Sequence, residues 1–119
     1  MAVPQEYEII RDLDTVREAI IAENRGILLF LVNKYRQYLP REIYKTEHIP
    51  SSRVDQLSCC LVPQDISPNL VPLKSTGNGN CLFNSASILL IGNESLHGVL
   101  RLLTAAEIFL HYTFYASHP

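Results

Sequence analysis

The chain has 119 residues, of which 47% are hydrophobic and 18% charged, and its formal net charge is −2 at pH 7. This length suits one small domain, and the balanced charge argues against direct nucleic-acid binding, which needs a concentrated basic face. The first ten residues lack a signal-peptide pattern, and the longest apolar run, residues 27–32, is too short to cross a bilayer. We therefore expect an intracellular protein, cytoplasmic or nuclear, without a membrane segment.

The charged side chains are unevenly distributed along the chain. Residues 1–56 hold nine of the twelve acidic and eight of the ten basic side chains. We therefore predict two regions, a charged and mainly helical region over residues 1–56 and a more apolar region over residues 57–119. So apolar a segment is expected to be covered by further structure, which predicts that the sequence holds only part of a larger domain.

In the first region, the sequence predicts a helical hairpin. Thr15 and Glu18 have the spacing of a capping box, so a helix is expected to begin there, and Gly26 is expected to break it. After Gly26 an apolar stripe at helical spacing continues until Pro40 stops it: Ile27, Leu28, Leu31, Tyr35, Tyr38 and Leu39. The hairpin is interpreted as a packing element, with docking of a partner as the alternative.

Residues 40–75 contain five prolines, which indicates extended connections and short strands instead of helix. The segment 57–62 is predicted to form a short strand with Cys59 and Cys60 on opposite faces. Adjacent cysteines do not have the spacing of metal ligands, so we expect no metal or other cofactor.

The most informative segment is residues 77–83, Gly-Asn-Gly-Asn-Cys-Leu-Phe. The two glycines predict a tight turn, and the apolar spacing that follows places Cys81 in the first turn of a helix closed by Gly92. The positive end of that helix favours a thiolate, and its unpaired amides can hold an oxyanion. The pattern therefore allows a nucleophilic Cys81, although a cysteine at such a position is more often a small buried hydrophobic residue.

A third helical region is predicted to begin near Ser95, whose hydroxyl is expected to cap it. Its apolar side would present Val99, Leu100, Leu103, Leu110 and Phe114. We expect this helix to pack against the Cys81 helix and to fix the angle at which the thiol is presented.

These residues resemble the ovarian tumour (OTU) family of cysteine proteases. That family has an Asp-Gly-Asn-Cys-Leu-Phe nucleophile segment, then a helix, a glycine-containing turn and a second helix with a Leu-Arg pair. The matching positions here are Asn78, Gly79, Asn80, Cys81, Leu82, Phe83, Gly92, His97, Leu100 and Arg101. A narrower resemblance is to the vertnin-like branch, and it runs from residues 62–65 through Asn69, Pro72, Leu73 and Ala86-Ser87 to Phe114-Tyr115. Vertnin itself is regarded as a nuclear, DNA-associated regulator and lacks the nucleophile, whereas this chain keeps Cys81.

The resemblance implies an α+β fold in which a helical N-terminal segment precedes the nucleophile-helix portion of a papain-type cysteine protease domain. Cys81 would attack the isopeptide carbonyl of a ubiquitin conjugate, and the turn of Asn78, Gly79 and Asn80 would line the oxyanion site. Asn78 stands where the family usually has aspartate.

The family also needs a base histidine, and His48, His97, His111 and His118 do not stand at its position. We therefore expect the chain by itself to be incomplete as a thiol-dependent deubiquitinase. The alternative is a non-catalytic vertnin-like module that acts in protein interaction or transcription regulation.

Overall fold

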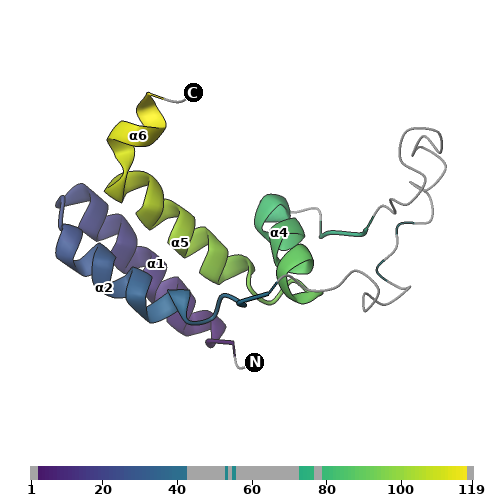
Figure 1. Cartoon of the computed structure of the whole chain (residues 1–119). Helices are drawn as coiled ribbons and strands as arrows, with labels where there is room; N and C mark the ends of the chain where they lie inside the picture. The colour runs from purple at the N-terminus through teal and green to yellow at the C-terminus, as the bar shows by residue number, and fades with distance from the viewer. Residues whose placement is uncertain (1–2, 43–52, 54, 56–72, 77–78, 118–119) are drawn as a thin grey trace.

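The structure is a computed structural model that describes residues 3–42, 53, 55, 73–76 and 79–117. This part of the chain contains helices α1 (Glu6–Ile21), α2 (Arg25–Arg36), α4 (Cys81–Ile91), α5 (His97–Leu110) and α6 (Tyr112–Ala116). Helices α1 and α2 form a hairpin, α5 lies along it, and α4 lies beside the first turns of α5 (Figure 1). None of these helices is long and apolar enough to cross a membrane.

Helix α1 begins nine residues before the predicted capping box. Its first residue is Glu6, and its N-cap residue Gln5 makes no side-chain capping bond. Thr15 lies inside the helix, where its hydroxyl donates to the carbonyl of Arg11 at 3.1 Å. The predicted cap at Thr15 is therefore wrong, because a threonine hydroxyl inside a helix can bond back to the preceding turn instead of starting a new one.

The break between α1 and α2 lies before Gly26. Glu23 has a positive φ of 54°, and the side chain of Asn24 accepts a 3.2 Å hydrogen bond from the amide of Ile27. Asn24 is therefore the N-cap of α2, and Gly26 sits inside the first turn. The prediction that Gly26 breaks the helix is wrong. Helix α2 also ends at Arg36, so Tyr38 and Leu39 lie beyond it and Pro40 is not the residue that stops it.

One hydrophobic core joins the hairpin to α5. It consists of residues from α1, α2, α5 and the turn before α5: Ile9, Val16, Ala19, Leu28, Leu31, Tyr35, Leu96, Val99, Leu102, Ala106 and Leu110. Helices α1 and α5 approach closely at Gly98, where an added Cβ would lie 2.9 Å from Cγ2 of Ile9. The predicted division at residue 56 stays a prediction, but the core contains residues from both sides of it.

Helix α5 starts and ends differently from the prediction. It begins at His97 after the N-cap residue Leu96, and the amide of Leu96 donates to the buried hydroxyl of Ser87 at 2.9 Å. The expected cap at Ser95 is wrong, since the N-cap residue is Leu96 and its amide is bound by Ser87 of α4. Helix α5 ends at Leu110, so Phe114 belongs to α6 and is exposed.

The predicted α+β fold is wrong for the described residues, which are helical and contain no sheet. Their extended structure is limited to a bridge residue, Leu73, beside a 2.6 Å hydrogen bond from the amide of Lys74 to the carbonyl of Arg53. Helices α1, α2 and α5 bury their apolar stripes against one another, so they need no sheet to cover them. The predicted strand over residues 57–62 lies outside the described residues.

Candidate functional site

Cys81 is the first residue of α4, as the sequence predicts, and its side chain is exposed. The helix starts there because the amide of Asn84 donates to the carbonyl of Asn80 at 2.8 Å. It ends at Gly92, whose φ of 82° suits a glycine and allows its amide to bond the carbonyl of Ile88. The alternative of a buried, inert cysteine does not fit this position.

The amides of Cys81, Leu82 and Phe83 have no hydrogen-bond acceptor within the described part of the chain. They are the N–H groups that a helix leaves unpaired at its start, and they carry the positive end of the helix dipole. An exposed thiol therefore lies beside amides that can accept an anion. A thiol and oxyanion-binding amides are two of the groups that thiol-dependent acyl transfer requires, and the third is a base.

The turn before Cys81 is only partly described. Gly79 has no positive φ, and an added Cβ would meet no atom within 4 Å, so the space around it is open. Its partner in the predicted turn, Asn78, lies outside the described residues together with Gly77. The oxyanion-site role assigned to Asn78, Gly79 and Asn80 therefore stays a prediction.

Arg101 of α5 holds the turn from the side of the second helix. Its Nη2 donates to the carbonyl of Gly79 at 2.9 Å, and its guanidinium lies 5.3 Å from the ring centroid of Phe83. Arg101 therefore contacts residues on both sides of Cys81. The sequence offered the Leu-Arg pair of the resemblance as a signal, but reasoning from the residues assigned Arg101 no role.

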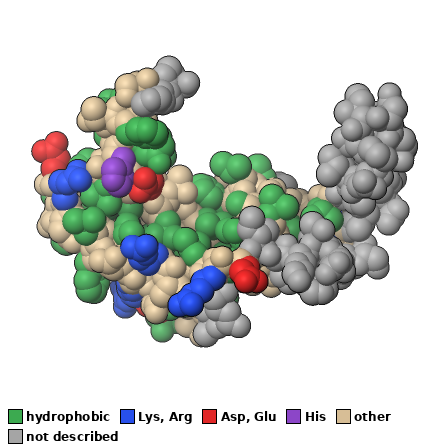
Figure 2. Space-filling view, in the orientation of Figure 1, with side chains coloured by type: hydrophobic (Ala, Val, Ile, Leu, Met, Phe, Trp, Pro, Cys, Tyr) green, Lys and Arg blue, Asp and Glu red, His purple; other side chains and the backbone are tan. Residues whose placement is uncertain are grey.

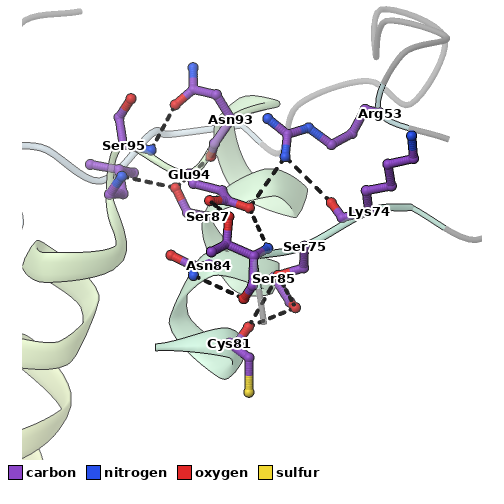
Figure 3. Close-up of polar contacts among 12 residues, drawn as sticks. Arg53, Lys74, Ser75, Cys81, Asn84, Ser85, Ser87, Asn93, Glu94 and Ser95 are labelled. Carbon is purple, nitrogen blue, oxygen red and sulfur yellow. Dashed lines mark hydrogen bonds and ion pairs between the residues drawn. The ribbon is translucent and has the colours of Figure 1, made fainter. Parts of the chain in front are cut away.

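A cluster of small polar side chains ties residues 75 and 76 to α4 (Figure 3). The hydroxyl of Ser85 donates to the carbonyl of Cys81 at 2.8 Å, and the hydroxyl of Ser75 bonds the same carbonyl at 3.4 Å. The side-chain amide of Asn84 donates to the carbonyl of Thr76 at 3.4 Å. The sulfur of Cys81 points away from this cluster, so the cluster fixes the backbone and leaves the thiol free.

The carboxylate of Glu94, in the turn between α4 and α5, binds the same segment. It accepts hydrogen bonds from the amide of Thr76 at 2.8 Å and the hydroxyl of Thr76 at 2.6 Å. Arg53 adds an ion pair at 3.2 Å. The hydrogen bonds from Thr76 and the nearby charge of Arg53 lower the pKa of Glu94 below its ordinary value.

The described histidines do not pair with the thiol. His97 lines a cavity of about 400 Å³ whose wall also includes Asn80 and Arg101, but the side chain of Cys81 lies outside that wall. Nδ1 of His111 lies 3.1 Å from a carboxylate oxygen of Glu107, at the far end of α5. His48 and His118 lie outside the described residues. Within the described part, the Cys81 thiol has no hydrogen-bonded base.

Among the described residues, no group of three or more His, Cys, Asp or Glu side chains is arranged to hold a metal ion. The adjacent Cys59 and Cys60 lie outside this part of the chain.

Comparison with known proteins supports the OTU resemblance. Residues 72–119 match the family described as "Vertnin, OTU domain". The chain is 40% identical to vertnin of Bos taurus over 62 residues, which is 52% of this chain and 9% of that protein. The same extent matches vertnin of Homo sapiens at 40% identity and vertnin of Danio rerio at 36%.

The chain thus spans about 9% of the length of these relatives. No solved structure matches it. The predicted resemblance is confirmed in its vertnin-like form: residues 72–119 are similar to the vertnin OTU domain, and Cys81 lies within the matched segment.

Proposed function

We propose that this vertnin-like OTU segment supplies the nucleophile of a thiol-dependent deubiquitinase, with Cys81 as the attacking group. The observation that carries the proposal is the exposed thiol at the first position of α4, next to three amides that lack an acceptor in the described structure. The fine assignment to a ubiquitin isopeptide comes from the OTU resemblance. The coarser statement, an OTU-related module, rests on the family match.

In the proposed reaction, the Cys81 thiolate attacks the carbonyl carbon of the isopeptide bond. The carbonyl oxygen becomes an oxyanion, which the amides of Cys81 and its neighbours stabilise. The bond to the lysine nitrogen then breaks, that nitrogen takes up a proton, and a thioester remains on Cys81. Water hydrolyses the thioester, which releases the ubiquitin carboxylate and restores the thiol.

The step that the described residues do not provide is the proton transfer. A base must take the thiol proton and later protonate the leaving amine, and histidine is the usual side chain for this work. His97 and His111 make no contact with the thiol in the described structure. An added imidazole can test this step, because it can supply the missing base from solution.

A second candidate function is a non-catalytic vertnin-like module that binds a protein partner. The absence of a base beside Cys81 in the described residues favours it, and so does the exposed apolar surface. Leu82 and Leu89 of α4 are 72% and 55% exposed, and apolar side chains cover much of the face shown over α4 and α5 (Figure 2). Apolar surface left in solvent is typical of sites that bind another protein.

The deciding experiment is labelling with a ubiquitin probe that carries a thiol-reactive group at its C-terminus. The chain would be treated with and without imidazole, beside Cys81→Ala and a Cys59→Ala/Cys60→Ala control. We expect a ubiquitin adduct that is lost in Cys81→Ala and retained in the control.

Iodoacetamide would measure thiol accessibility in parallel. If iodoacetamide alkylates Cys81 but the ubiquitin probe labels neither the chain nor its imidazole-treated form, the protease proposal is wrong. That result would favour the interaction module. Labelling that persists in Cys81→Ala would equally exclude Cys81 as the nucleophile.

A further inference from the structure

We propose that Glu94 and Arg101 are a pair of positioning residues that hold the chain just before Cys81 at two points. Glu94 binds the chain before the turn, at Thr76, and Arg101 binds the turn itself, at Gly79, two residues before Cys81. The inference rests on the proposed function, because it assigns these residues to the presentation of the nucleophile. Neither residue contacts the thiol, so neither is a catalytic residue.

The attachment at Thr76 is strong for a site near the surface. One carboxylate accepts from both the backbone and the side chain of Thr76, at 2.8 and 2.6 Å. The Glu94 side chain is 22% exposed, which limits competition from water. Arg53 pairs with the same carboxylate and also donates to the carbonyl of Lys74 at 3.4 Å. Bonds to an ionised acceptor are stronger than neutral ones, so this contact can fix the position of the segment.

The attachment at Gly79 comes from α5 itself, whereas Glu94 lies in the turn before this helix. Arg101 lies four residues into the helix, and its Nη2 reaches the carbonyl of Gly79 at 2.9 Å. Its guanidinium also faces the ring of Phe83, two residues after Cys81. Its Nε is buried and has no hydrogen-bond partner among the described residues, so the described contacts of this guanidinium are those with Gly79 and Phe83.

Movement at Thr76 would be transmitted to the first turn of α4. The carbonyl of Thr76 accepts a hydrogen bond from the side-chain amide of Asn84, a residue that is 2% exposed. The backbone amide of Asn84 donates to the carbonyl of Asn80. Ser75 bonds both Ser85 and the carbonyl of Cys81. The positions of the thiol and of the free amides therefore depend on both attachments.

A purely structural role for the pair predicts a loss of stability and nothing specific at Cys81. The positioning role predicts a loss at the site that exceeds the loss of stability. The two roles can be separated by following local and global properties in the same variants. Glu107→Ala is the matched control, because Glu107 has the same charge and lies in α5, but it bonds His111 and Tyr115 at the other end.

The experiment compares Glu94→Ala, Arg101→Ala and Glu107→Ala with the unchanged chain. Hydrogen exchange of the Thr76 amide and of the amides of residues 81–83 reports the turn, and urea denaturation reports global stability. The ubiquitin probe and iodoacetamide report the thiol. Arg101→Lys tests whether a charge without the planar guanidinium restores the Gly79 bond.

We expect Glu94→Ala to raise exchange of the Thr76 amide by about tenfold or more, because that amide loses its charged acceptor. Glu94→Ala and Arg101→Ala should each slow probe labelling by ~10- to 100-fold, because the thiol is misplaced. Arg101→Lys should recover part of this loss, and Glu107→Ala should match the unchanged chain. The urea midpoints of Glu94→Ala and Glu107→Ala should be similar.

The positioning inference would be overturned if Glu94→Ala and Arg101→Ala left hydrogen exchange unchanged at the amides of Thr76 and residues 81–83. So would labelling losses that merely follow the change in urea midpoint. If the probe labels no form of the protein, the proposed function fails. In that case faster exchange at Thr76 and an altered rate of iodoacetamide reaction at Cys81 would still support the inference, and unchanged values would refute it.

Discussion

The substitution Asp12→Ala should destabilise the helical hairpin more than any change to an exposed charge. Asp12 is 6% exposed, and its Oδ2 accepts from the hydroxyl of Tyr35 at 2.5 Å and from Nζ of Lys34 at 2.7 Å. Tyr35 is fully buried, so without Asp12 its hydroxyl has no acceptor. Lys34 keeps a second partner, Glu8, at 2.8 Å.

The size of the effect follows from what each partner loses. Removing one member of a buried charged pair costs about 3–5 kcal/mol, and a buried hydroxyl without an acceptor costs about 1–3 kcal/mol within that total. The Lys34 side chain is 27% exposed and retains Glu8, so water and Glu8 compensate part of its loss. We therefore expect the free energy of unfolding to fall by about 3 kcal/mol, at the lower end of the range.

Urea denaturation followed by circular dichroism measures this change. The double variant Asp12→Ala/Tyr35→Phe removes the orphaned hydroxyl and should recover about 1–2 kcal/mol of the loss. Asp14→Ala is the matched control, because Asp14 is exposed on the same helix, and it should change stability by no more than ~0.5 kcal/mol. A loss below ~1 kcal/mol for Asp12→Ala, or no recovery in the double variant, would refute the reasoning.

Two further predictions concern packing and pH. Gly98→Ala should lower the free energy of unfolding by about 1–3 kcal/mol, because its Cβ would lie 2.9 Å from Cγ2 of Ile9. Gly26 is the second residue of α2, as Gly98 is of α5, and Gly26→Ala should be neutral or stabilising in the same urea titration, since the added Cβ would lie 3.5 Å from Oδ1 of Asn24. Equal losses of unfolding free energy in the two variants would contradict this. Acid should weaken the fold through Asp12, since burial raises its pKa but hydrogen bonds from Lys34 and Tyr35 outweigh this and lower it overall. A lowered folded-state pKa adds stability above the unfolded pKa of about 4, and this is lost as pH falls through the folded value. Urea midpoints from pH 7 to 3 should thus fall less steeply in Asp12→Asn, and parallel curves would exclude a contribution from this group.

The sequence predicted the features of the site that depend on neighbouring residues. The start of α4 at Cys81 and its end at Gly92 follow from local signals, a turn and a glycine that can adopt a positive φ. The bonds that hold the Cys81 turn could not be read in this way. Glu94 and Arg101 reach the turn only after α4 and α5 pack together, so their contacts depend on tertiary structure.

The wrong start predicted for the first helix has a physical cause. Asp12 occupies a buried position of α1, where Tyr35 and Lys34 satisfy it, and a carboxylate there interrupts the apolar periodicity that would have extended the helix back to Glu6. The expected sheet failed for a different reason. It was inferred from the family and not from a pattern in the described residues, whose apolar stripes are at helical spacing.

Helix α5 packs against the hairpin, so it joins the two regions that the sequence analysis divides at residue 56. Its apolar side is covered by the hairpin, so Val99, Leu102 and Ala106 are fully buried, while its first turns hold the chain around Cys81 through Arg101. The family match covers residues 72–119 and does not include the hairpin. Exposing one large apolar side chain costs about 1.5–3 kcal/mol, so in this chain α5 without the hairpin would lose much of its stability. The segment matched by the family model is therefore smaller than the structural unit that positions Cys81. The hairpin lies outside the match, but it stabilises α5, and Arg101 of α5 holds the chain before Cys81.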